Sequence, residues 1–335
     1  MITLDGSMGE GGGQVLRTAL ALSLVTGQPF AIDQIRAGRE KPGLKRQHLT
    51  AVLAAAEVGN AAIEGAELGS MRLTFKPKDL RGGDYKFAIG TAGSTTLVLQ
   101  TVLPALLTAA APSSIELVGG THNPLAPPFD FLQHTWAPLL RRMGAPLELE
   151  LLQHGFFPAG GGVMRVRTSQ AKWSPLSLVT VPEQAIVSAR IVHSQLPANI
   201  ARREADTLAA VLGIARDQIV TVEVRSPGPG NAVLVHVGLG EVTEVIAAFG
   251  ERSVTAEAVA TGAAREAQAL LAAKVPVGQY LADQLLLPMA MAGGGAVLTV
   301  EPSLHTKTNA QVIEHFLPVR FGFHATAEGW RIEVG

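Results

Sequence analysis

Residues 14–58 read QVLRTALALSLVTGQPFAIDQIRAGREKPGLKRQHLTAVLAAAEV, and this stretch decides the fold class. Apolar residues recur with a helical period over Gln14–Thr26, change to an aromatic and β-branched run at Phe30–Ile35, and resume the helical period over Leu44–Val58. Two short strands are expected next, at 61–64 and 72–76. The stretch therefore predicts one α-β-α-β-β unit of an α/β (α+β) protein.

The same order of elements recurs twice more along the chain. A second copy begins with a helix at 93–110, followed by a strand at 114–118, a helix at 129–143 and strands at 147–152 and 162–167. A third begins with a helix at 280–292, followed by a strand at 296–301, a helix at 308–317 and strands at 320–326 and 330–334. The period is longer than the roughly 20 to 50 residues of solenoids, so three units packed around a shared core are expected.

The third copy starts much farther from the second than the second does from the first, which indicates an inserted module. The polar segment SQAKWSP at 169–175 marks its start. Inside it, strands are expected at 185–192, 220–225 and 232–237, and helices at 200–212 and 255–272. The expected division is residues 1–175 for the first two repeats, 176–275 for a small α/β insert and 276–335 for the third repeat.

Composition describes an ordinary globular protein. The chain has 335 residues, of which 47% are hydrophobic, so it can bury a sizeable core, and it has no cysteine, which excludes disulfides and thiolate metal sites. A net charge of −1 argues against a protein that coats nucleic acid. A local basic site is still possible, because Arg36–Arg46 gathers arginine and lysine residues, although such a run is often only a solvated face.

Neither export nor membrane insertion is expected. The beginning MITLDGSMGEGGG has acids and glycines where a signal peptide needs a basic start and an apolar run, so a cytoplasmic protein is expected. The apolar stretch 19–26 is too short to cross a bilayer, and the longer run 97–111 is interrupted by Pro104.

One loop recurs in a polar, glycine- and proline-rich form in all three copies, between the first strand and the second helix. Its three versions are RAGREKPG at 36–43, GGTHNPLAPP at 119–128 and PSLHTKT at 302–308. If the copies are related by a pseudo-threefold axis, these loops converge at one end. A site built there from loops on a rigid scaffold is the resulting hypothesis.

The segment GEGGGQVLR at 9–17 places glycines directly before a helix, where phosphate can approach the backbone. It matches neither the Walker A nor the dinucleotide pattern, and a structural tight turn explains it equally well. Glu10, Gln14 and Arg17 would share one side of the opening turns. Glu10 could then hold a divalent metal and Arg17 a phosphate, or the two could form a simple ion pair.

His305 lies in the third loop beside Lys307. An exposed imidazole facing the basic loop could attack a phosphoryl group, although a loop histidine is often just a surface residue. His122 and Asn123, in the second loop, are interpreted as loop-shaping residues.

Tyr280, Asp283 and Gln284 fall on one helical face, where an aromatic ring, an acid and an amide can bind a purine. The same spacing also occurs in an ordinary amphipathic helix.

Long strings in this chain resemble the RNA 3′-terminal phosphate cyclase family, in order and through all three repeats, and more weakly in the insert. They are DGSMGEGGGQVLR, IRAGREKPGLKRQHL, GDYKFAIGTAGSTTLVLQTVLPAL, FFPAGGG, GQYLADQLLLPMA and SLHTKTNAQVIEHFLPVRF. The resemblance implies three repeats like the C-terminal domain of translation initiation factor three, with a smaller inserted α/β domain.

The resemblance also implies a reaction. A histidine, here His305, attacks the α-phosphate of ATP, the AMP moves to an RNA 3′-phosphate, and the neighbouring 2′-hydroxyl displaces AMP to leave a 2′,3′-cyclic phosphate. Glu10 would bind Mg²⁺ or Mn²⁺. The remaining ATP-binding residues implied by the motif match are Gln14, Arg17, Arg36, Arg39, Gln47, Gln100, Pro127, Tyr280, Leu281, Ala282, Asp283 and Gln284.

Two positions depart from the family pattern. His122 stands where Asp or Asn is common, and an aromatic residue that covers adenine is replaced around Ala247, with Phe249 nearby. The partner implied is RNA with a 3′-terminal phosphate, bound by a monomer or a homodimer. A non-catalytic cyclase-like ribosome-assembly protein would lack the histidine, and an enolpyruvyl transferase would carry more repeats and no adenylated histidine.

Overall fold

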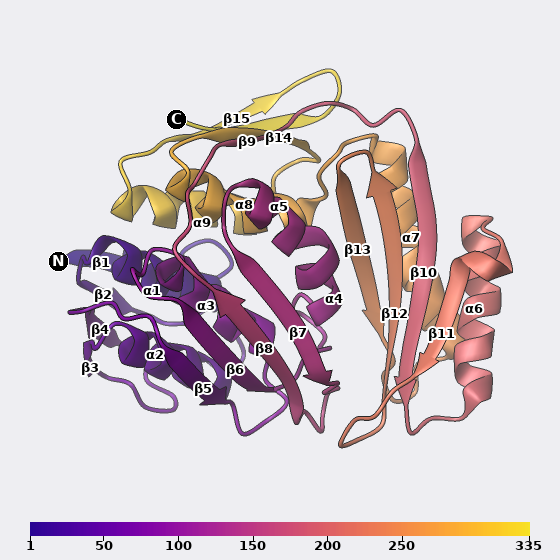
Figure 1. The fold of residues 1–335 in the computed structure, drawn as a ribbon, viewed down its shortest axis with the longest axis horizontal. Coiled ribbons are helices and arrows are strands. Elements are labelled where there is room, and N and C mark those ends of the chain that lie inside the picture. Colours follow the sequence, from indigo (N-terminus) through magenta and orange to yellow (C-terminus); the bar gives the residue numbers. More distant parts are fainter.

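Three small sheets in the computed structural model, which describes residues 1–335, share one strand order (Figure 1). In the first, the order is β1-β2-β4-β3, with β1 parallel to β2 and the other pairs antiparallel. Helices α1 and α2 follow β1 and β2. The bounds are β1 (Ile2–Asp5), α1 (Gln14–Thr26), β2 (Phe30–Asp33), α2 (Arg46–Val58), β3 (Ala62–Glu64) and β4 (Leu73–Lys76).

The second sheet has the order β5-β6-β8-β7, with the same parallel and antiparallel pairs. Its bounds are β5 (Asp84–Ala88), α3 (Thr95–Leu106), β6 (Ser113–Gly119), α4 (Phe129–Phe131), α5 (Ala137–Arg142), β7 (Leu147–Gln153) and β8 (Gly162–Thr168). A π-helical turn at Leu132–Trp136 joins α4 to α5, so the single helix expected over 129–143 is interrupted by a wider turn.

The third sheet, β9-β14-β16-β15, repeats the arrangement again. Its bounds are β9 (Leu176–Leu178), α8 (Gln279–Met291), β14 (Gly295–Thr299), α9 (Leu304–Phe316), β15 (Phe321–Ala325) and β16 (Trp330–Val334). Each repeat is therefore β-α-β-α-β-β, and the protein is α+β with mixed sheets. The opening strands β1, β5 and β9 were not predicted, because three to five residues with one buried face carry little periodic signal.

The insert interrupts the third repeat and does not simply precede it. Strand β9 pairs with β14, so residues 176–178 belong to the third sheet, and the boundary expected at 175/176 is wrong there. The insert has the strand order β11-β10-β12-β13. Its bounds are β10 (Ala185–Ser194), α6 (Ala198–Leu212), a 3₁₀ turn (Arg216–Gln218), β11 (Ile219–Glu223), β12 (Gly230–Leu239), the unpredicted β13 (Val242–Phe249) and α7 (Ala256–Ala273).

Two hydrophobic clusters hold the molecule together. The larger one runs through all three repeats, where α1 packs against α3 and α9, and α8 packs against α9. The insert sheet joins both clusters, because alternate residues of a strand face opposite sides. Val192 and Leu234 belong to the cluster of the repeats, whereas Ile191 and Val233 belong to the cluster that includes α6 and α7. These two helices cover the face of the insert sheet that lies away from the repeats (Figure 1). No helix is both long and apolar enough to cross a membrane.

Helix α9 begins earlier than expected, at Leu304 instead of Thr308. The Ser303 hydroxyl caps it by accepting the Thr306 amide at 3.1 Å. His305 therefore lies in the first turn of a helix and not in a loop, which fixes its direction.

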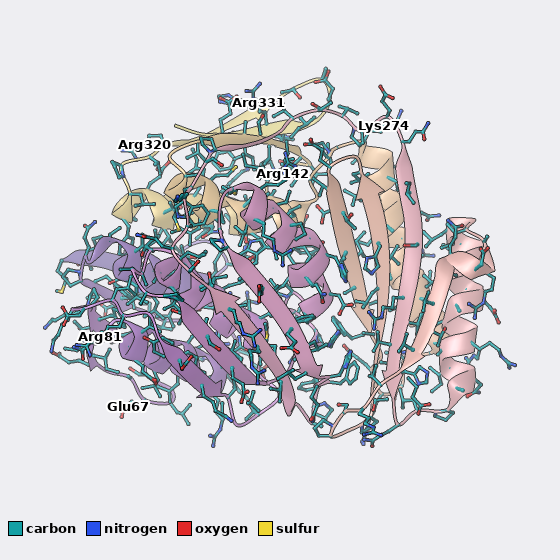
Figure 2. The ribbon with its side chains drawn as sticks, viewed as in Figure 1. Glu67, Arg81, Arg142, Lys274, Arg320 and Arg331 are labelled. Atoms are coloured by element: carbon teal, nitrogen blue, oxygen red, sulfur yellow. The ribbon has the colours of Figure 1, made fainter.

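The cap of α7 makes the fold testable. Lys274 ends this helix in the left-handed conformation at φ 52°, and its side chain reaches into solvent (Figure 2). Because that conformation favours glycine, Lys274→Gly is expected to raise the free energy of unfolding by about 0.5–1 kcal/mol. Gly213 caps α6 at φ 67°, so Gly213→Ala is the matched control and should lower it by about 1 kcal/mol. Urea denaturation measures both, and a loss of stability in Lys274→Gly would contradict the assignment.

Candidate active site

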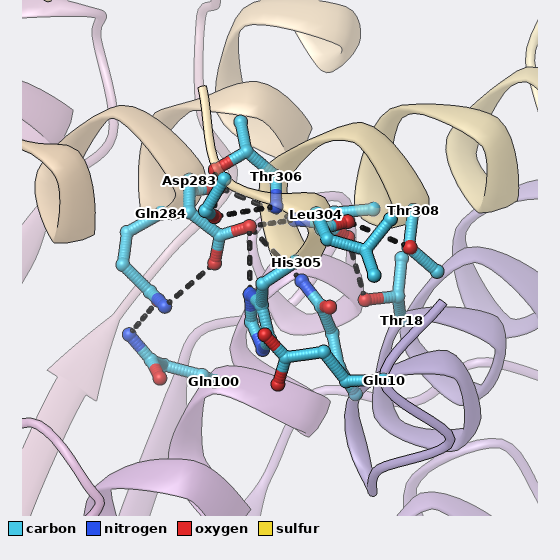
Figure 3. Close-up of polar contacts among 12 residues, drawn as sticks. Glu10, Thr18, Gln100, Asp283, Gln284, Leu304, His305, Thr306 and Thr308 are labelled. Atoms are coloured by element: carbon cyan, nitrogen blue, oxygen red, sulfur yellow. Dashed lines mark hydrogen bonds and ion pairs between the residues drawn. The ribbon is translucent and has the colours of Figure 1, made fainter. Parts of the chain in front are cut away.

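A buried carboxylate, that of Asp283 on α8, joins three helices. Its side chain is only 6% exposed. Gln14 of α1 donates to Oδ1 at 3.0 Å, and Asn309 of α9 donates to the same oxygen at 3.3 Å and to the Asp283 carbonyl at 3.2 Å (Figure 3). Gln284 donates to Oδ2 at 3.3 Å. A buried carboxylate needs such donors, since burial without them is costly.

His305 contacts the same carboxylate. Its Nδ1 lies 3.1 Å from Asp283 Oδ1, and its side chain is 36% exposed (Figure 3). The ring is thus held at one nitrogen by a buried acid while part of it reaches solvent. Asn309 follows one turn after His305 and is itself held by the Thr18 hydroxyl at 2.9 Å. One face of the first two turns of α9 is therefore fixed against α1 and α8.

These side chains line a cavity between α1, α3, α8 and α9. On its α3 side, Gln100 donates to Gln284 Oε1 at 2.5 Å, and the Trp136 indole donates to the Gln284 carbonyl at 3.2 Å. The polar residues around the cavity are Gln14, Arg17, Thr18, Gln100, Asp283, Gln284, His305 and Asn309. The structure thus brings together Gln14, Arg17, Gln100, Asp283, Gln284 and His305 from the predicted set.

Arg17 is the cation of this cavity. Burial lowers the pKa of its guanidinium to about 10, and the charge of Asp283 partly offsets that effect. The side chain therefore remains positive at neutral pH while little water competes for it. An anion that enters the cavity meets a strongly interacting charge.

His48 lies behind the glycine-rich segment and was not predicted as part of the site. A Cβ at Gly13 would overlap the His48 ring and lie 2.8 Å from Arg17 Nη1, so this close approach requires glycine. Burial is the main cause that lowers the pKa of His48 to about 3, and the charges of Arg17, Arg36 and Lys45 add to it. His48 is consequently neutral near pH 7.

The two arginines of the first-repeat loop, Arg36 and Arg39, make different contacts. Arg36 is 6% exposed, has φ 56°, and donates through Nη1 to the carbonyls of Lys41 at 2.7 Å and Gly43 at 2.8 Å. It was expected to line a phosphate path, but that nitrogen instead holds the loop in shape. Arg39 pairs with Glu10 at 3.4 Å, and both side chains are about half exposed. The ion-pair partner of Glu10 is thus Arg39 and not Arg17.

Several predicted residues lie away from the cavity. Gln47 accepts a hydrogen bond from the Ser94 amide at 2.8 Å, and the Pro127 carbonyl accepts one from the Thr96 hydroxyl at 2.7 Å. Gln47 and Pro127 therefore both contact the start of α3. Tyr280 is 61% exposed at the start of α8.

The helix after Tyr280 buries its next two residues, Leu281 and Ala282, in the core, so their side chains offer nothing to a ligand. In the insert, Phe249 pairs with Ala232 at the end of β13 and packs against the larger hydrophobic cluster. None of these three residues lines the cavity.

Two of the three polar loops contact the glycine-rich segment. Gly9 of that segment lies against Thr308 of the third-repeat loop, and Gly11 lies against Gly38 of the first-repeat loop. Gln47, in the helix after the first-repeat loop, accepts the Ser94 amide of the second repeat. The second-repeat loop faces the insert, where Asp130 lies 3.9 Å from Arg190. The insert therefore occupies the place that the glycine-rich segment has in the first repeat. The first and third loops thus meet at one segment, and the second faces the insert.

His122 belongs to this third junction and is buried. Its Nε2 lies 2.8 Å from Asp130, its Nδ1 lies 2.9 Å from the Thr121 hydroxyl, and its ring stacks on His154. Asn123 is also buried, and it donates to the Ala92 carbonyl. Both residues are tied to neighbouring backbone and side chains, as the loop-shaping interpretation predicted.

A comparison with models of protein families shows the family of this chain. Residues 8–323 match the family model described as RNA 3′-terminal phosphate cyclase. The chain belongs to the RNA 3′-terminal phosphate cyclase family. Among solved structures, the enolpyruvyl transferase NikO from Streptomyces tendae matches this cyclase-family chain with 16% identity and a TM-score of 0.28. That match covers 50% of this chain and 33% of the other, and a likeness so low carries no argument.

The neutral His48 makes the stability of this family member depend on pH. Its folded pKa of about 3 lies below the unfolded value near 6.5, so the unfolded state binds the extra proton, and stability is lost as pH falls through this window. His48→Asn removes that loss. Between about pH 6 and pH 4, the free-energy advantage of the parent over the variant should shrink by about 1 kcal/mol per pH unit. Denaturant unfolding without nucleotide measures it, and a constant difference would contradict a buried neutral His48.

Proposed function

We propose that this protein uses ATP to convert an RNA 3′-terminal phosphate into a 2′,3′-cyclic phosphate through an AMP carried on His305. The observation that supports it most directly is the 3.1 Å contact between His305 Nδ1 and the buried Asp283 carboxylate beside a cationic cavity. Family membership points to the same RNA chemistry. We also infer that the repeats share the fold of the C-terminal domain of translation initiation factor three, an inference supported by their common strand order.

The reaction would begin with attack by His305 Nε2 on the α-phosphorus of ATP. The new N–P bond forms as the bond to the bridging oxygen breaks, and pyrophosphate leaves. An oxygen of the RNA 3′-phosphate then attacks the AMP phosphorus and displaces the histidine nitrogen. Finally, the 2′-hydroxyl attacks the activated 3′-phosphorus, AMP leaves with the bond electrons, and the hydroxyl proton passes to solvent.

Asp283 would set the histidine for this attack. A proton held on Nδ1 toward the carboxylate leaves the Nε2 lone pair free, which is the nucleophilic form of the ring. The carboxylate is fixed by Gln14 and Asn309, so it cannot swing away. This arrangement reassigns Asp283. The sequence suggested that it accepts a hydrogen bond from adenine, but its oxygens already accept hydrogen bonds from protein donors. Base recognition would then rest on Gln284 and Gln100, which line the cavity.

Phosphate binding would rest on Arg17 within the cavity and on Arg39, which lies against the glycine-rich segment. Arg17 remains charged despite burial, and Arg39 is half exposed and can turn from Glu10 toward a ligand. Both guanidinium groups suit phosphate oxygens, and both would stabilise charge as pyrophosphate departs.

Glu10 fits a metal site completed by the substrate. No group of three or more His, Asp or Glu side chains that could hold a metal occurs in the structure. A single half-exposed carboxylate matches the way Mg²⁺ is often held, by one or two protein oxygens, phosphates and water. When bound, Mg²⁺ or Mn²⁺ would neutralise charge on the phosphates.

His305→Ala is expected to abolish covalent AMP while leaving the protein folded. Intact mass after incubation with ATP and Mg²⁺ should show the added AMP on the parent alone. His315, near the end of the same helix, supplies a matched control, and His315→Ala should retain the adduct. If the folded His305→Ala protein still carried AMP, another residue would be the nucleophile. A parent without any adduct would favour the alternative, a non-catalytic cyclase-like ribosome-assembly protein.

Asp283→Asn separates the positioning role from base recognition. The amide can donate to Nδ1 and so favour the wrong tautomer, and single-turnover adenylation should slow by about 10²-fold or more. The preference for ATP over GTP should remain that of the parent. Gln284→Ala should have the opposite effect: the preference for ATP over GTP should weaken, while the single-turnover rate of adenylation with ATP stays close to that of the parent. If Asp283→Asn lost the preference for ATP but adenylated at the parent rate, Asp283 would bind adenine and would not position His305.

A further inference from the structure

The basic run 36–46, which extends from the loop into the start of α2, carries three cations that the proposed chemistry does not use. Lys41, Lys45 and Arg46 are exposed, and none of them forms an ion pair. We call these three side chains the cation ridge. Of the acids, only Glu40 lies within the stretch 36–46. The ridge is therefore a local concentration of unpaired positive charge on a chain whose net charge is −1.

The loop that carries the ridge is held rigidly. Arg36 donates to two carbonyls of the loop from inside. Backbone hydrogen bonds close its base, from the Gly43 amide to the Ile35 carbonyl at 2.8 Å and from the Leu44 amide to the Ser70 carbonyl at 3.0 Å. Charges on a fixed backbone lose less entropy on binding than charges on a mobile loop.

The ridge also adjoins the candidate active site. Its neighbour Arg39 pairs with Glu10, and Gly38 packs against Gly11 of the glycine-rich segment. The charge of Lys45 contributes to the lowered pKa of His48, which lies against Gly13 behind Arg17. The ridge therefore borders the glycine-rich segment that leads into α1, the helix that carries the cavity cation Arg17.

We propose that the cation ridge binds the backbone phosphates of the RNA nucleotides that precede the 3′-terminal phosphate, an inference that rests on the proposed function. The phosphates of ATP are served by Arg17 and Arg39. A polynucleotide held at its terminal phosphate brings further phosphates past the glycine-rich segment, and exposed lysine and arginine bind these without regard to sequence. Each contact releases condensed counterions, so the ridge acts through charge and is weakened by salt.

The test replaces the ridge by glutamine in Lys41→Gln/Lys45→Gln/Arg46→Gln. For a long oligonucleotide with a 3′-phosphate, KM should rise about tenfold to a hundredfold, and the slope of log KM against log salt should fall by about 2. For a dinucleotide with a 3′-phosphate, KM should stay at the parent value. The rate of adenylation without RNA should also be unchanged, which reports that the variant is folded.

The matched control lies at the other end of the same helix. Lys76, Lys78 and Arg81 are exposed, and the amides of Lys78 and Arg81 bind carbonyls at the C-terminal end of α2 (Figure 2 labels Arg81). Their triple glutamine variant makes the same change in net charge and should leave KM for the long RNA unchanged. An equal rise in both variants, or no rise in the ridge variant, would overturn the proposal. A parent that neither binds AMP covalently nor cyclises the dinucleotide would instead refute the proposed function.

Discussion

The buried carboxylate of Asp283 is the interaction on which the rest of the site depends. It draws hydrogen bonds from α1 and α9 onto α8 and so fixes His305, which shares the same oxygen. A carboxylate at this depth is tolerated only when donors surround it. The geometry needed for the fold and the geometry needed for the proposed nucleophile therefore coincide, and a change at Asp283 acts on both.

The three repeats explain why one junction differs from the others. At two junctions, the segment that precedes the first helix of a repeat is short: the glycine-rich segment contacts Thr308 of the third repeat, and Ser94 contacts Gln47 of the first. At the third junction the insert takes its place, and His122 and Asp130 are buried against it. Next to the cavity residue Arg17, Gly13 lets His48 approach the backbone, and Gly9 does the same for Thr308, because a Cβ at either position would clash.

Local patterning in the sequence predicted most of the fold and part of the site. Long amphipathic helices such as α1 and α6 were found at nearly their observed bounds, because a helical period over a dozen residues is a strong signal. The strands β1, β5 and β9 were missed because they are short and become strands through pairing. The early start of α9 was missed although Ser303 was a visible cap, and a helix from 304 would have placed Asn309 beside His305.

By itself the sequence determined the repeat, the insert, the family and His305 as the candidate nucleophile, since each rests on residue types and local order. Only the tertiary structure decided what several of these side chains do. Gln14 and Asp283 form a hydrogen bond although 269 positions separate them in the sequence. Arg36 donates to carbonyls of its own loop, and its residue type alone does not predict those partners. Hydrogen-bond partners depend on which surfaces the packed helices bring together, and no local pattern encodes that choice.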